Sequence, residues 1–317
     1  YFFLKKTFDA VIVGFPGQEA MLLIHLLTKK PIIFDVFTSH YGGYVLDRGK
    51  YSKDSLRAKW YKWLDKKSVE LANVALLDTN AHIDFFVNEF SLPKNKFIRV
   101  FVGTDSDIFY PRSAEGYSGA SLGGSKRNGG KFLVHFHGHY IPLQGVKHII
   151  QAAKVLEREN IEFNIIGKGQ TYKNDRKLAE DLKIKNINFL DQVPYNKLAD
   201  YINSADISLG IFGETKKASI VIPNKVYEAI ACAKPVITAD TPAIRELFTD
   251  GQDILLCKKA DREDLAEKIL LLKNNPDLRE KIGLGGRQLF KKYLTEDNLG
   301  AQLKNIVYET IKLPKSL

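Results

Sequence analysis

Short aliphatic runs alternate with helix-forming segments along almost the whole chain, and this alternation limits the fold more than any other feature. The runs that predict strands are 9–15, 31–37, 73–79, 97–102, 131–138, 163–169, 187–193, 207–212, 235–239 and 253–257. Helical patterns fill most of the intervals between them, including a short one at 243–248. Repeated β-α alternation predicts parallel sheets covered by helices on both faces. We therefore expect an α/β fold with two doubly wound, Rossmann-like domains.

A stretch rich in glycine and serine divides the chain. Residues 113–130, "SAEGYSGASLGGSKRNGG", contain six glycines and four serines, which is the composition of a flexible linker. The expected organisation is a first domain at 1–112, a linker at 113–130, a second domain at 131–295 and a C-terminal helix at 296–317. Because the first strand follows Tyr1 closely, we expect the first domain to be incomplete at its start.

Composition excludes several classes of protein. Hydrophobic residues make up 44% of the chain and charged residues 26%, as in ordinary globular proteins. No apolar run reaches the roughly 18 residues of a membrane span, and no leader peptide is visible. Cys232 and Cys257 lack the spacing of metal or redox sites, so a reducing, cytoplasmic compartment is expected.

The net charge of +10 raises the question of nucleic acid binding. Residues 1–112 carry 16 basic and 12 acidic side chains, and residues 131–317 carry 29 and 24. The excess is therefore spread over both halves, and no strand combines basic residues with aromatic ones. We expect no nucleic acid partner.

Polar and glycine-containing loops follow four successive strands of the second domain. Ligands of doubly wound domains bind at the carboxyl ends of the strands. The candidates in the first three loops are Gly138, His139 and Gln144, then Gly167 and Lys168, then Gln192 and Val193. The fourth loop, 213–225, contains three lysines and leads into a helix. One glycine turn is usually only a turn, but four such loops at one edge favour a nucleotide.

The helix that follows the fourth loop begins with "PNKVYE", residues 223–228. A surface helix start explains these residues equally well, with Pro223 as first helical residue and the others in water. The functional interpretation is that Asn224 and Val226 supply amide donors and Lys225 a cation for a diphosphate. Glu228, one turn further on, is placed to accept the two vicinal hydroxyls of a ribose.

Three motifs resemble retaining glycosyltransferases of family 4, which have the two-domain GT-B fold. They are "VFVGTDSDIFYP" between the domains, "GHYIPLQG" as a donor loop, and "VYEAIACAKPVITADTPAIREL" at the ribose. The resemblance covers most of the chain. It implies transfer of a sugar from a nucleoside-diphosphate-sugar to a glycan or lipid-linked acceptor with retention of configuration, without a cofactor. It also implies that residues 1–112 face the acceptor, that 131–295 bind the donor, and that the C-terminal helix returns to the first domain.

The chain departs from the family pattern on the donor side. The family arginine and lysine of the donor loop fall on His139 and Gln144, and the first glutamate of the Glu-x7-Glu pair falls on Ile220. A Pro-Asn-Lys turn replaces the usual Phe-Gly, as in a branch with Pro-Ser-Lys. Lys225, with Lys216 or Lys217, would restore the lost charge.

On the acceptor side the family histidine falls on Phe37, so the nearby His40 becomes the candidate. The residues expected to take part in the reaction are then His40, Lys225 and Glu228. An isolated loop histidine is more often structural, and this alternative stays open. The "DSD" at 105–107 imitates the Asp-x-Asp metal motif of other sugar transferases but lies in the interdomain segment. We therefore expect no metal.

Two alternatives to the transferase remain open. One is a sugar-nucleotide epimerase of the same fold, and the other is a degenerate member that binds the nucleotide without transferring sugar.

Residues 48–67 suggest a membrane surface as a further partner. They contain eight basic and two acidic residues and both tryptophans, Trp60 and Trp63. Three residues apart on a helix, these rings share one face, and aromatic rings flanked by lysines suit an anionic lipid boundary. In the plainer alternative, Trp60, Trp63 and Leu64 pack on the sheet and only the lysines face water.

Overall fold

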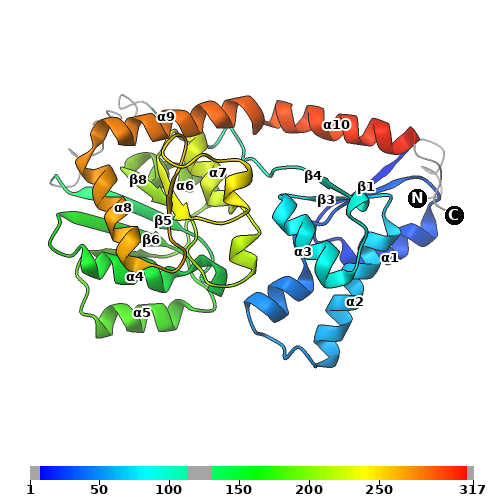
Figure 1. Cartoon of the computed structure of the whole chain (residues 1–317), viewed down its shortest axis with the longest axis horizontal. Helices are drawn as coiled ribbons and strands as arrows, with labels where there is room; N and C mark the ends of the chain where they lie inside the picture. The colour runs from blue at the N-terminus through cyan, green and yellow to red at the C-terminus, as the bar shows by residue number, and fades with distance from the viewer. Residues whose placement is uncertain (1–7, 113–129, 313–317) are drawn as a thin grey trace. The chain divides into compact units, whose positions relative to one another are not determined.

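The computed structural model describes residues 8–112 and 130–312 and forms two compact units (Figure 1). The first unit comprises Tyr1–Phe101 with Asp297–Leu317, and the second comprises Val102–Glu296. The expected linker at 113–130 lies outside the described residues except for Gly130.

The first unit contains one parallel sheet in the order β1-β2-β3-β4. Its strands are β1 (Val11–Val13), β2 (Ile32–Asp35), β3 (Val74–Leu77) and β4 (Phe97–Arg99). Its helices are α1 (Gln18–Leu27), α2 (Leu56–Leu71), α3 (Asn80–Phe90) and α10 (Glu296–Lys312), with the π-helix η1 (Tyr41–Asp47) and the 3-10 turn η2 (Lys94–Lys96).

The C-terminal helix α10 packs on the sheet of the first unit. Ile306 of α10 lies in one apolar cluster with Ile33, Val74 and Leu76 of β2 and β3. Gln302 adds a hydrogen bond from its Nε2 to the carbonyl oxygen of Arg99 at 3.0 Å. More than 200 residues of sequence therefore separate these strand residues from the helix residues that cover them.

The second unit contains a six-stranded parallel sheet in the order β10-β9-β8-β5-β6-β7. Its strands are β5 (Phe132–His137), β6 (Ile161–Ile166), β7 (Ile187–Leu190), β8 (Ile207–Leu209), β9 (Val236–Ala239) and β10 (Leu255–Cys257). Its helices are α4 (Val146–Val155), α5 (Tyr172–Asp181), α6 (Tyr195–Ser204), α7 (Asn224–Ala231), α8 (Arg262–Asn274) and α9 (Pro276–Tyr293). The 3-10 turns are η4 (Pro142–Gln144), η5 (Lys217–Ser219) and η6 (Ile244–Glu246).

Helices cover both faces of this sheet (Figure 1). Phe132, Val134 and Phe136 of β5 pack in one apolar core that includes residues of α4 and α8. His137 points to the other face, where it contacts Glu228 of α7. The order of the strands and the two covered faces are those of a doubly wound fold, which confirms the predicted fold class.

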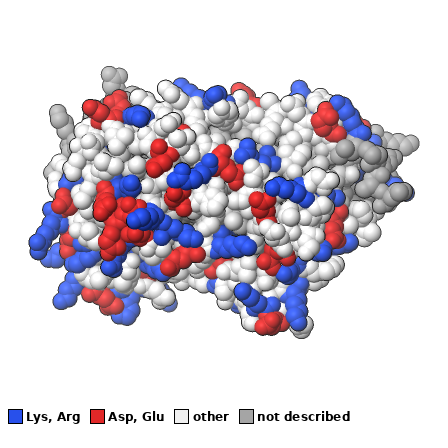
Figure 2. Space-filling view, viewed as in Figure 1, with Lys and Arg blue, Asp and Glu red and all other residues white. Residues whose placement is uncertain are grey.

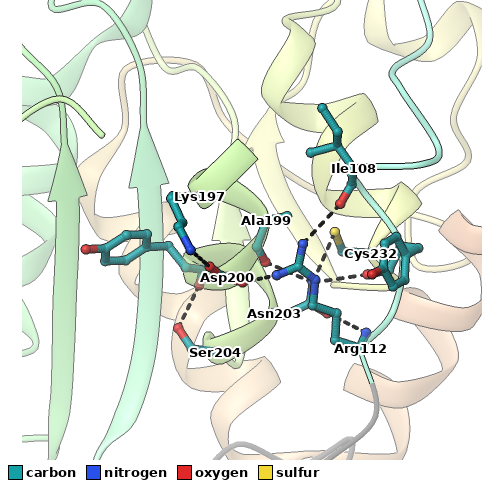
Figure 3. A network of polar contacts seen from close by, with 10 residues as sticks. Ile108, Arg112, Lys197, Ala199, Asp200, Asn203, Ser204 and Cys232 are labelled. Atoms are coloured by element: carbon teal, nitrogen blue, oxygen red, sulfur yellow. Dashed lines mark hydrogen bonds and ion pairs between the residues drawn. The ribbon is translucent and has the colours of Figure 1, made fainter. Parts of the chain in front are cut away.

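The segment 102–112 belongs to the second unit rather than to the first domain, where the sequence analysis placed it. Arg112 binds Asp200 of α6 through its guanidinium, and its amide donates to Asn203 Oδ1 at 3.1 Å (Figure 3). Phe109 is fully buried and meets the ring of Tyr195 edge-on at 5.2 Å. These contacts join residues about 90 positions apart. The glycine-rich composition of residues 113–130 therefore could not show that the domain boundary lies before residue 102.

One short segment differs from expectation. The helix expected at 243–248 is only the 3-10 turn η6, and a turn beginning at Thr249 follows it. In the "DSD" segment, the Asp105 carboxylate accepts the amides of Asp107 and Ile108 at 2.9 and 3.2 Å. This carboxylate therefore stabilises a tight turn.

The visible surface of each unit carries acidic and basic side chains interspersed rather than gathered into one large basic patch (Figure 2). Among the described residues, no helix combines the length and the apolar character that crossing a bilayer requires.

Candidate functional site

The loops after β5 and β6 meet at the carboxyl edge of the second sheet. The amide of Gly138 donates to the carbonyl oxygen of Ile166 at 3.0 Å, and that of Tyr140 to Lys168 at 2.9 Å. Gly167, with φ of +133°, lies so close that a Cβ atom there would collide with the carbonyl oxygen of Gly138. Glycine is therefore required for the two loops to approach each other.

The loop after β8 joins the same edge. The amides of Phe212 and Gly213 donate to the carbonyl oxygens of Gln144 and Leu143 at 3.0 and 3.1 Å. Gly145 adopts φ of +66° directly before α4, where a Cβ would collide with the backbone of Phe212. Three of the four predicted loops are thus held together by backbone hydrogen bonds.

Helix α7 begins at this edge without a capping side chain. Its first-turn amides have no acceptor within the helix, which is the arrangement that suits an anion. One predicted donor has to be corrected, because the amide of Val226 already donates to the carbonyl oxygen of Pro223 at 2.9 Å. The amides of Asn224 and Lys225 precede it in the turn and remain the candidates.

Lys225 is buried, although its sequence position suggested a solvated cation. Its Nζ binds the Oε1 of Gln144 and lies 3.7 Å from the centre of the Phe136 ring, against the backbone of Gly138. Among the described residues no carboxylate lies within ion-pair distance of this Nζ. Burial holds the pKa of Lys225 well below its usual value, while the nearby Glu228 raises it in part.

Glu228 is buried as well and is held by a histidine that the sequence analysis missed. His137 Nε2 lies 2.6 Å from Glu228 Oε2, and His137 Nδ1 lies 2.9 Å from His135 Nε2. Burial, with the neighbouring His137 and Lys225, holds the pKa of His135 well below its usual value. The available signal was the pair of alternate polar residues in the apolar strand "FLVHFH".

The other predicted donor residues lie around this buried group. Gln144 lines it, whereas His139, Gln192 and Asn224 are exposed and Val193 is half-buried. Lys168 is exposed and pairs with Asp191, with its Nζ 2.9 Å from the Oδ1. Ile220, in the place of the family glutamate, is buried.

In the first unit, His40 follows β2 in a loop that a buried carboxylate fixes. Asp65 of α2 accepts hydrogen bonds from Ser39 Oγ at 2.6 Å, Tyr41 N at 2.8 Å and His40 N at 3.0 Å. Burial raises the pKa of Asp65 to about 6. The Nδ1 of His40 lies 4.0 Å from Glu19 Oε1.

Phe37, which occupies the position of the family histidine, adopts φ of +52°, an unfavourable conformation for a bulky residue. Its half-exposed ring packs on that of Phe15 at 5.3 Å. At position 37, the loop before His40 therefore presents an aromatic rather than a polar side chain.

Helix α2 agrees with the plainer account of the tryptophan segment for Leu64 but not for the two tryptophans. Leu64 is fully buried, but Trp60 and Trp63 are 44% and 46% exposed and stack with ring centres 5.0 Å apart. Leu56, one turn earlier, is 86% exposed. These three side chains follow the i, i+4, i+7 spacing of one helical face.

The model of the family "Glycosyl transferases group 1" matches residues 122–289. An uncharacterised glycosyltransferase of Methanocaldococcus jannaschii is 28% identical over 210 residues, covering 64% of this chain and 51% of the relative. A phosphatidyl-myo-inositol mannosyltransferase of Mycobacterium leprae is 30% identical over 199 residues, covering 61% and 50%. The chain thus spans about half the length of these curated relatives.

Two solved structures share the fold. Sucrose-phosphate synthase of Thermosynechococcus elongatus superposes with a TM-score of 0.77 at 14% identity, covering 97% of this chain and 75% of that one. HepE of Anabaena, in complex with UDP and glucose, superposes with a TM-score of 0.76 at 13% identity, covering 95% and 78%. The chain belongs to the group 1 glycosyl transferases and has their GT-B fold of two Rossmann-like domains.

Proposed function

We propose that the protein transfers a hexosyl group from a nucleoside-diphosphate-sugar to a hydroxyl group of a glycan or lipid-linked acceptor, with retention of configuration. The observation that carries the proposal is the pair of buried, oppositely charged residues at the carboxyl edge of the second sheet. Lys225 has no carboxylate within ion-pair distance among the described residues, and Glu228 lies one turn further along α7. An anion bound at the start of α7 would supply the counterion that Lys225 lacks.

The roles of these groups follow from their positions on α7. The first-turn amides and the Lys225 ammonium bind the diphosphate and stabilise the negative charge that grows on it as the sugar departs. Glu228 accepts the ribose hydroxyls. The bond from the anomeric carbon to the diphosphate oxygen breaks, the bond to the acceptor oxygen forms on the same face, and the acceptor proton passes to the departing diphosphate. No step in this scheme requires a metal or a cofactor.

Donor binding is the first test. We expect one of UDP, GDP and ADP to raise the melting temperature, because a ligand at 100 times its Kd adds about 2.7 kcal/mol of stability. Its sugar conjugate should then release free sugar slowly, or transfer it when an acceptor extract is added.

The products distinguish the alternatives. An isomeric sugar nucleotide would identify an epimerase, and binding without turnover would identify a degenerate member. If none of the three nucleotides shifts the melting temperature, the proposed donor site is wrong.

On the acceptor side, we propose His40 as a residue that contacts the acceptor, and an anionic membrane surface as the place where a lipid-linked acceptor is met. The exposed stripe of Leu56, Trp60 and Trp63 supports the second proposal. Lys59 is an exposed cation on the same helix, and the exposed Lys53 precedes the helix by three residues. The protein would then be a peripheral protein on the inner face of a membrane.

The two tryptophans allow a direct measurement, because they are the only ones in the chain. Vesicles containing brominated phosphatidylglycerol should quench their fluorescence at low salt, and brominated phosphatidylcholine vesicles should not. Replacing Lys53 and Lys59 with glutamine should weaken binding roughly 30-fold, at about 1 kcal/mol for each cation. The matched control replaces Lys177 and Lys183 of the second unit. Absence of quenching by the anionic vesicles would contradict the membrane proposal.

A further inference from the structure

The two histidines of β5 form a buried polar chain that ends on Glu228. The chain runs from His135 Nε2 to His137 Nδ1 at 2.9 Å, and from His137 Nε2 to Glu228 Oε2 at 2.6 Å. All three residues are more than nine-tenths buried. A buried carboxylate is costly unless a hydrogen-bond donor or a cation accompanies it, so the contact with His137 has a large influence on Glu228.

The hydrogen positions follow from these contacts. With both rings neutral and the Glu228 carboxylate ionised, one arrangement satisfies the two short contacts at once: His135 donates from Nε2 to Nδ1 of His137, and His137 donates from Nε2 to Glu228. The Nδ1 of His135 is buried and has no hydrogen-bond partner among the described residues. It can therefore remain the unprotonated nitrogen that this arrangement requires.

We propose that His137 is a positioning residue that orients the Glu228 carboxylate, and that His135 fixes the tautomer of His137. The inference rests on the proposed donor site, where Glu228 accepts the ribose hydroxyls. Neither histidine touches the nucleotide in this arrangement. Their effect reaches the nucleotide only through the orientation of the Glu228 carboxylate. In a similar way, a carboxylate or carbonyl group orients a metal-binding histidine.

Nucleoside and pyrophosphate binding should respond differently to the loss of His137. Replacing His137 with leucine should raise the Kd of the nucleoside diphosphate that binds the parent protein about 10-fold, the effect of one hydrogen bond to a charged group. The Kd of inorganic pyrophosphate should stay within about twofold, because pyrophosphate meets α7 and Lys225 but has no ribose. A general loss of packing would weaken both ligands.

A conservative variant and a pH series complete the test. His137→Gln keeps a donor near the Nε2 position and should restore most of the affinity. The groups facing Glu228 are His137 and His135 from β5, Lys225 from α7 and Tyr195 from α6. In His137→Leu the carboxylate has lost its donor, so nucleoside binding should be weaker than in the parent protein at every pH between 6 and 8. His25→Leu, at an exposed histidine of the first unit, is the control.

The outcomes separate this inference from the donor site itself. If no nucleoside diphosphate binds the parent protein, the donor site is wrong. If Glu228→Ala loses nucleoside binding while His137→Leu keeps it at every pH, the donor site stands and the positioning role is overturned. Should His137→Leu fail to fold, His135→Leu replaces it. If His135→Leu leaves the ratio of the nucleoside diphosphate and pyrophosphate affinities unchanged, the positioning role is likewise overturned.

Discussion

Replacing Lys225 with methionine is expected to raise the Kd of the nucleoside diphosphate about 100-fold and, at the same time, to stabilise the protein. The loss of affinity corresponds to roughly 3 kcal/mol, which is the upper range for a hydrogen bond to a charged group. The gain in stability arises because methionine has a similar shape and needs no counterion. Lys225 is buried beside Gln144 and the Phe136 ring, so its ammonium is costly until an anion binds.

The pH dependence of that gain has a definite sign. Burial lowers the pKa of Lys225 in the folded protein below its ordinary value of 10.5. The unfolded chain therefore binds more protons at this residue, and the stability of the parent protein rises with pH up to about pH 10. The advantage of Lys225→Met should accordingly be largest near neutral pH and should shrink as the pH increases.

Calorimetric titration and urea unfolding measure the two effects. Lys177→Met is the control, because Lys177 lies on α5 and pairs with Asp181 at the surface. Its affinity for nucleotide should not change. If Lys225→Met lowers the stability and leaves nucleotide affinity intact, Lys225 is a structural residue and the anion site lies elsewhere.

The sequence predicted those features that depend on local patterns. Alternating aliphatic runs and helical segments were sufficient to predict the parallel sheets, because each strand and helix carries its own periodicity. Gly138 and Gly167 were placed in loops that follow two strands of the second domain, and the structure shows that these two loops approach each other closely. The C-terminal helix was expected to return to the first domain because family members have one, not because its own residues show where it packs.

Features that depend on distant contacts could not be predicted in this way. His137 acquires a meaning only when α7, about 90 residues later, brings Glu228 to it. In the same way, Arg112 and Phe109 connect the segment 102–112 to the second unit through α6. The sequence left open whether Lys225 lies in water or at an anion site. Only the structure, in which the loops approach each other closely, shows that this residue is buried.

Asp65 is the clearest case of a residue whose importance the sequence conceals, and it gives the second large effect. It lies in the basic segment of α2 and looks like a surface acid, yet its side chain holds the loop of His40 through three hydrogen bonds. Asp65→Asn leaves one acceptor oxygen for the three donors. We therefore expect a loss of about 2–3 kcal/mol in the free energy of unfolding, because each unsatisfied buried donor costs about 1–3 kcal/mol.

The stability lost in Asp65→Asn should become smaller as the pH rises. A carboxylate whose pKa is lowered by folding would give the opposite trend. Burial raises the pKa of Asp65 from 3.8 to about 6, so the folded protein binds more protons than the unfolded chain between about pH 4 and pH 6. The parent protein therefore loses stability relative to Asp65→Asn as the pH rises through this window, by about 3 kcal/mol at 1.36 kcal/mol for each pKa unit. Urea unfolding of both proteins between pH 4.5 and pH 7.5 measures the difference, with Glu70→Gln on the same helix as the exposed control. A difference that stays constant or widens as the pH rises would show that Asp65 is ionised at no cost in the folded protein. A loss of stability in Asp65→Asn no larger than that in Glu70→Gln would show that Asp65 does not hold the loop of His40.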